Sequence, residues 1–127
     1  MMAKLRRLFA ALEAEIRLPA NAKPWSTAQA RHPVLNRVAT IHSVLAILGD
    51  TGNNALRYKD ILTRALIAEH KRNPGAFWTA ALLLAYSPML YRLRGRIMGD
   101  AFSSDDLDQL VISAFLDVVK QFPLLQK

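Results

Sequence analysis

The sequence predicts an all-α fold, a compact helical bundle of about five or six helices. Apolar residues recur at three- and four-residue spacing in most segments of the 127-residue chain, which places them on one face of a helix. No segment alternates with a period of two over enough residues to predict a strand. Hydrophobic residues make up 52% of the chain and charged residues 21%, the balance of a globular protein. We therefore expect a single helical domain over residues 1–127.

The first part of the chain, residues 1–75, is predicted to be an N-terminal helical extension. Its first helix covers Lys4 to Arg17, where apolar residues share one face. The stretch "LPANAKPWST" contains two prolines and no periodicity, so we predict a loop or extended crossing that Trp25 anchors to the core. A helix ending at Gly49 follows, with Thr40 as its candidate N-cap. Another helix runs from the turn cluster "DTGNN" to about position 72.

The second part, residues 76–127, begins with a long helical stretch to about Met98. Pro88 removes one backbone hydrogen bond and should bend or divide this stretch near residues 84–87. Its most apolar run, "AFWTAALLLAY", is far shorter than the roughly 20 residues that cross a bilayer, so we expect a buried helix and no membrane span. Ser103 followed by Asp106 resembles a capping box at the start of the last helix.

Catalytic and metal-binding patterns are not found in the sequence. The chain has no cysteine, which excludes disulfides, thiolate zinc sites and a cysteine nucleophile and favours a reducing, cytoplasmic location. Aspartates in the first turn of the last helix stabilise the helix dipole without a metal ion. There is no glycine-rich phosphate loop and no nucleophile-elbow serine. We expect no enzyme activity, no cofactor and no metal at the dispersed histidines His32, His42 and His70.

Positive charge is concentrated in the first part of the chain. The net charge is +7, and residues 1–75 hold 12 Lys and Arg against 5 Asp and Glu, while residues 76–127 hold 5 of each. Such a surface attracts nucleic acid or anionic lipid by long-range electrostatics. The alternative is a solvated surface without a charged partner.

The segment "YRLRGRI" carries three closely spaced arginines. Arg92 and Arg96 lie four residues apart and share a helical face, whereas Arg94 points elsewhere. Two alternatives are open for these side chains. They grip phosphate groups of DNA, or they pair with the aspartates of the last helix across a short turn.

The last predicted helix, in "SSDDLDQLVISAFLDVVKQF", is apolar on nearly all sides, although covering a core requires one apolar stripe. Helical spacing divides it into an inward stripe and an opposite side. The inward stripe contains Leu107, Val111, Ala114, Phe115 and Val118, and the opposite side contains Asp106, Gln109, Ile112, Leu116 and Val119.

The segment "YSPMLYRLRGRIMGD" together with this last helix resembles the start of region two of bacterial RNA polymerase sigma factors. In that family a helix beginning Tyr-x-Pro-x-Leu leads through a Gly-Asp turn into a helix of the type Asp-Leu-x-Gln that continues to a Phe. The resemblance covers about residues 77–122. The residues that follow the family pattern in step are Tyr86, Pro88, Leu90, Arg92, Gly99, Asp100, Asp106, Leu107, Gln109, Val119 and Phe122.

The resemblance implies a binding module in transcription. In the family, the second of these helices docks on the clamp helices of the polymerase β′ subunit, which would account for a helix with two apolar sides. DNA is a further candidate partner. The alternative from another class is a helical scaffold whose second apolar face forms a homodimer. The resemblance assigns the partner role to Asp106, Gln109, Leu110, Ile112 and Leu116.

Overall fold

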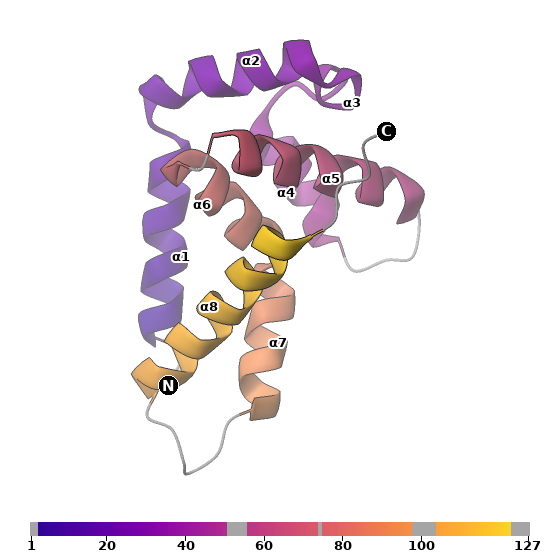
Figure 1. Cartoon of the computed structure of the whole chain (residues 1–127). Coiled ribbons are helices and arrows are strands. Elements are labelled where there is room, and N and C mark those ends of the chain that lie inside the picture. Colours follow the sequence, from indigo (N-terminus) through magenta and orange to yellow (C-terminus); the bar gives the residue numbers. More distant parts are fainter. Residues whose placement is uncertain (1–2, 51–55, 74, 98–103, 123–127) are drawn as a thin grey trace.

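The protein is an all-α structure, as predicted. The computed structural model describes residues 3–50, 56–73, 75–97 and 104–122, and these residues form helices and no strand (Figure 1). The elements in chain order are α1 (Ala3–Ile16), the 3-10 helix η1 (Pro19–Asn21), α2 (Ala22–Arg31), α3 (Pro33–Asn36), α4 (Ile41–Gly49), α5 (Leu56–Arg72), α6 (Ala76–Ala85), α7 (Ser87–Ile97) and α8 (Ser104–Gln121).

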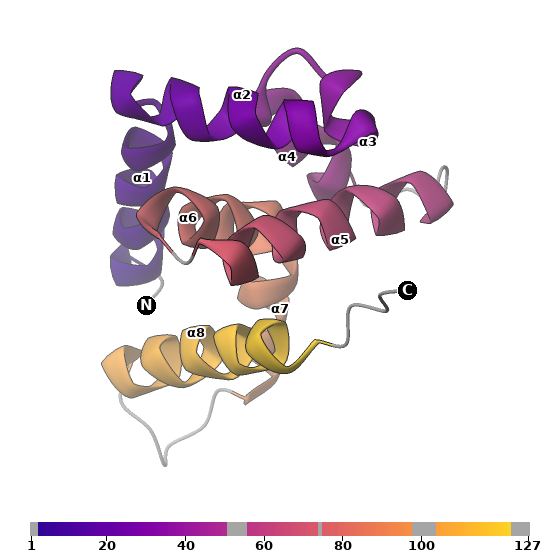
Figure 2. The same cartoon turned by 45° about the horizontal axis from the view of Figure 1, so that its top comes forward.

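Helix α6 forms the centre of the molecule. Seven of its ten residues are buried, because its apolar residues surround the helix instead of following one face. It packs against α1, α4 and α5. In Figures 1 and 2, α2 lies on one side of α5 and α6, and α8 lies on the other. The prediction of a buried helix in this segment is confirmed, and none of the described helices is long and apolar enough to span a membrane.

The long predicted helix over residues 76–98 divides where its proline was expected to divide it. Helix α6 ends at Ala85 and α7 begins at Ser87. Pro88 is therefore in the first turn of α7, where a missing backbone N–H leaves no helical hydrogen bond unmade. The Ser87 hydroxyl donates to the carbonyl oxygen of Leu84 at 2.9 Å, which satisfies one carbonyl at the end of α6.

The prediction of a loop in "LPANAKPWST" is wrong. The segment forms η1 and most of α2, because both of its prolines fall in the first turn of a helix, the position that tolerates them. Trp25 packs against the core as expected, and its Nε1 donates to the carbonyl oxygen of Ala39 at 3.4 Å. The count of five or six helices is roughly right for the described residues, and the additional α-helices are α2 and the short α3.

The ends of α4 are those that the sequence predicted. The Thr40 side chain accepts a hydrogen bond from the backbone N–H of Ser43 at 3.1 Å, and Gly49 is the last residue of the helix. The predicted capping serine Ser103 and the Gly99–Asp100 turn lie outside the described residues.

Both parts of the chain contribute to the same cores. The larger apolar cluster contains Ile16 of α1 and Val119 of α8, together with residues of α5 and α6. The smaller cluster joins Leu5 and Phe9 of α1 to residues of α6, α7 and α8, including Val111. The helices of residues 1–75 are therefore packed directly against the helices that follow residue 76.

Candidate partner-binding surface

An ion pair fixes α8 against α7. The Arg94 side chain is 1% exposed, and its Nε donates to Oδ1 of Asp108 at 2.5 Å. Asp108 is itself 14% exposed, so both charges are largely removed from water. Pairing with an aspartate of the last helix, one of the two alternatives for the arginines, is thus confirmed for Arg94. Its assignment as a nucleic-acid contact is wrong because burial keeps the guanidinium away from a phosphate.

The other two arginines of α7 lie on the surface. Arg92 and Arg96 are both exposed, and their spacing puts them on one side of the helix. They remain the candidate residues of α7 for contact with nucleic acid.

The buried side of α8 differs from the predicted inward stripe at its C-terminal end. Leu107 and Val111 are buried as expected, and Phe115 is half-buried, with its ring centroid 5.7 Å from that of Tyr86. Val119, expected on the opposite side, is 3% exposed. The buried stripe therefore shifts by one residue toward this end of the helix, because Val119 packs into the larger core cluster.

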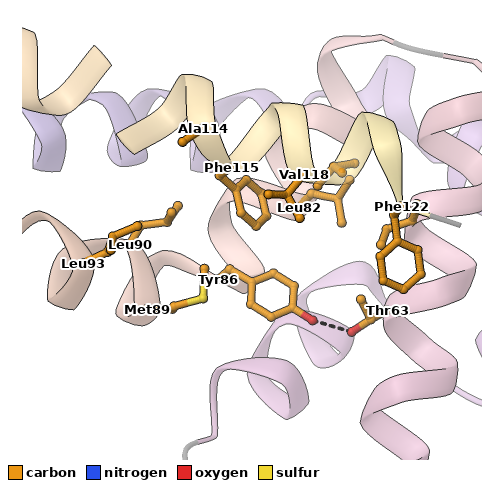
Figure 3. Close-up of a pocket in the computed structure, with 12 residues that line it drawn as sticks. Thr63, Leu82, Tyr86, Met89, Leu90, Leu93, Ala114, Phe115, Val118 and Phe122 are labelled. Carbon is orange, nitrogen blue, oxygen red and sulfur yellow. Dashed lines mark hydrogen bonds between the residues drawn. The ribbon is translucent and has the colours of Figure 1, made fainter. Parts of the chain in front are cut away.

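Two residues of the predicted inward stripe are exposed. Val118 is 63% exposed, and Ala114, one turn before it, is exposed as well. Both residues line a groove of about 370 Å³. The groove lies between α5, α7 and α8, and its labelled lining residues face one another in Figure 3. The prediction that these two side chains belong to the inward stripe is therefore wrong, because both are exposed where they line the groove.

The five residues assigned to a partner divide into two groups. Asp106, Gln109 and Leu110 are exposed, and Leu110 presents 41% of its surface. Ile112 and Leu116 are half-buried, because they pack against the smaller core cluster that contains residues of α1. This chain's own first helix thus covers part of the side that the resemblance assigns to the polymerase. We call the exposed group, Asp106, Gln109 and Leu110, the α8 strip.

A buried carboxylate elsewhere in the fold was missed by the sequence reasoning. Glu69 of α5 is 3% exposed, and both of its oxygens accept from Nη1 of Arg31 at 2.7 Å. Nε2 of His32 lies 2.8 Å from Oε2 of the same carboxylate. The three side chains join α2 and the loop after it to α5, which is a structural role. The sequence contains one indication of this burial, because Glu69 lies on the same face of α5 as the buried Leu62 and Leu66. Its partners could not be predicted, because they lie more than 35 residues away in the sequence.

Metal-binding geometry is absent from the described part of the chain. No three side chains of His, Asp or Glu there lie close enough together to hold a metal ion.

Comparison with family models, with curated proteins and with solved structures gives no match.

Proposed function

We propose that this chain is a binding module of transcription that docks on RNA polymerase core through the α8 strip. The observation that carries the proposal is the exposure of Asp106, Gln109 and Leu110 on one side of a helix, at positions where the resemblance expects contact with the β′ clamp helices. An exposed leucine beside an acid and an amide offers a partner one apolar anchor and two polar contacts.

The ion pair between α7 and α8 supports the same proposal. Because Arg94 and Asp108 hold the two helices together, the strip is presented on a fixed helix instead of a free segment. A surface that is ordered before binding loses less conformational entropy when the partner arrives.

A binding experiment with purified RNA polymerase core tests the proposal. Gln109→Ala combined with Leu110→Ala should weaken binding of the full chain by at least about tenfold, since central interface residues commonly contribute ~2 kcal/mol or more each. Lys120→Ala, an exposed position further along the same helix, serves as the matched control and should bind as the parent does. Equal binding by the double variant and the parent would remove the α8 strip from the interface.

Self-association is the second candidate function, and one observation favours it. Leu110, Ala114 and Val118 follow one another at four-residue spacing on α8, and all three are exposed, which forms an apolar ridge. A homodimer through this ridge would show a concentration-dependent mass in sedimentation velocity. Leu110→Lys should then shift the protein to the monomer.

A further inference from the structure

The groove between α5, α7 and α8 offers an occupant almost no hydrogen-bonding group. Ten of its twelve lining residues are apolar, and the two others are Thr63 and Tyr86. Their hydroxyl oxygens lie 2.5 Å apart and bond to each other (Figure 3). Burial also raises the pKa of Tyr86 above its ordinary value, so this hydroxyl stays protonated at neutral pH. A group that enters the groove is therefore hydrocarbon in character.

The groove is open along one side. Val118 on the α8 wall is 63% exposed, and Met89 on the α7 wall is 37% exposed. Sites for small molecules bury most of the ligand surface, and this open groove would leave one long side of such a ligand in water. A helix that inserts one apolar face and keeps its other face in solvent matches the shape. The flexible Met89 side chain can adapt to the inserted residues.

Positive charge borders the groove at the Phe122 end. The Arg64 guanidinium lies over the Phe122 ring, with Cζ 5.1 Å from the centroid. Lys71 Nζ donates to the carbonyl oxygen of Phe122 at 2.6 Å. Asp60 bonds to Nε of Arg64 at 3.0 Å, so at this end two cations stand beside one acid.

The Met89 end of the groove also has more positive than negative side chains. A smaller hollow shares Tyr86 and Met89 with the groove, and Arg92 and Asp50 also line it. Lys59 Nζ donates to the backbone oxygen of Asp50, which adds a second cation at this end. Because both ends carry more positive than negative side chains, the border is complementary to an acidic partner.

From these observations we infer that the groove binds an amphipathic helix of another protein, which inserts aliphatic side chains at i, i+3 or i+4, and i+7 and carries Asp or Glu on its flanks. This groove adjoins the α8 strip, because Ala114 and Val118 on its wall follow Leu110 of the strip at four-residue spacing. Its lining comes from four helices, α5, α6, α7 and α8, whereas the strip lies on α8 alone.

Two synthetic peptides test the inference. Each is a helix of about 18 residues with leucines at the inserted positions, and they differ only in flanking residues, glutamate in one and lysine in the other. Fluorescence anisotropy with the full chain should show the glutamate peptide binding at least about tenfold more tightly than the lysine peptide. Lys71→Glu should reduce that preference, because it reverses a charge at the Phe122 end.

Variants of α8 locate the bound peptide. Val118→Arg places a charge on the exposed groove wall and should weaken binding of the glutamate peptide by at least about tenfold. Ser113→Arg, on the same helix at an exposed position outside the groove lining, is the matched control and should leave it unchanged. A thermal melt of both variants confirms that each is folded before binding is compared.

Three results would overturn the inference. The first is equal affinity for the two peptides, or no binding of either. The second is unchanged peptide binding in folded Val118→Arg. The third is a dimer in sedimentation that Val118→Arg abolishes, because the groove would then be occupied by a second copy of this chain.

Discussion

Two contacts between ionisable side chains hold helices of this fold together, the Arg94–Asp108 pair and the cluster of Glu69 with Arg31 and His32. Arg94 and Asp108 are 14 positions apart, on helices joined by a short connection, so their pairing was foreseeable from spacing and sign. Glu69 meets Arg31 and His32 across 38 and 37 positions. No local rule predicts such a contact, because it depends on how distant helices pack.

Removing one partner of the α7–α8 ion pair should destabilise the fold. Asp108→Ala leaves the Arg94 guanidinium buried without its carboxylate, and the expected loss in unfolding free energy is roughly 3 kcal/mol. Asp117→Ala, at an exposed position of the same helix, should change the unfolding free energy by less than about 0.5 kcal/mol. Urea denaturation measures both. Similar small losses in the two variants would show that the pair contributes little to stability.

His70 should make stability depend on pH. Burial lowers the pKa of His70 in the folded state, and its Nδ1 is buried without a hydrogen-bond partner among the described residues. Between its unfolded pKa, about 6.5, and the lower folded pKa, the unfolded state binds more protons. The unfolding free energy should therefore fall as pH decreases from 7 through this window.

The variant His70→Gln isolates this contribution, because it removes the titrating group. Its unfolding free energy, measured by urea denaturation from pH 7 to about pH 5, should decrease less than that of the parent. A parallel decrease in both proteins would assign the pH dependence to other groups.

Helix α8 shows how much of the burial along one helix can be predicted from helical periodicity. Spacing correctly predicted Leu107 and Val111 as buried, but Val118, which was also predicted to face inward, is 63% exposed. Direction alone does not determine burial, because that requires a neighbouring element to cover the side chain. Spacing also did not predict that Ile112 and Leu116 pack against the core cluster that contains Leu5 and Phe9 of α1.

Two truncations in α8 test this assignment of its sides. Phe115→Ala should cost roughly 3 kcal/mol, near the lower end for a buried aromatic residue, because the ring is half-buried and packs against both core clusters. Val118→Ala should cost less than about 1 kcal/mol, since most of that side chain is already in water. Thermal or urea unfolding gives both values. Equal costs would mean that α8 is rotated from the orientation described.

At the scale of the whole molecule, the fold class follows from periodicity, but the joining of the two parts does not. Residues of α1, α5 and α8 share one core cluster. From the sequence, residues 1–75 are predicted to be an N-terminal extension of residues 76–127, and the pattern does not show that the two parts share a core. Charge placement predicted a basic first part without indicating that Arg64 and Lys71 border an apolar groove. These two cations lie beside the groove only because the helices pack in this arrangement, which the sequence pattern does not show.

The single-domain prediction leads to a cooperative unfolding experiment. Tryptophan fluorescence reports on Trp25 and Trp78, in α2 and α6, and circular dichroism reports on all helices. Because both parts contribute to common cores, the two signals should change with the same midpoint in urea. Separate midpoints would divide residues 1–75 from residues 76–127.

Site-specific photo-crosslinking most directly tests the claim that the α8 strip binds RNA polymerase core. A photoreactive amino acid replaces Gln109 in the full chain, and a second preparation carries it at His42, an exposed position on α4. On irradiation with purified polymerase core, we expect a crosslink from position 109 to the clamp helices of the β′ subunit and none from position 42. A crosslink from position 109 to a second copy of this chain, or none to the polymerase, would contradict this claim.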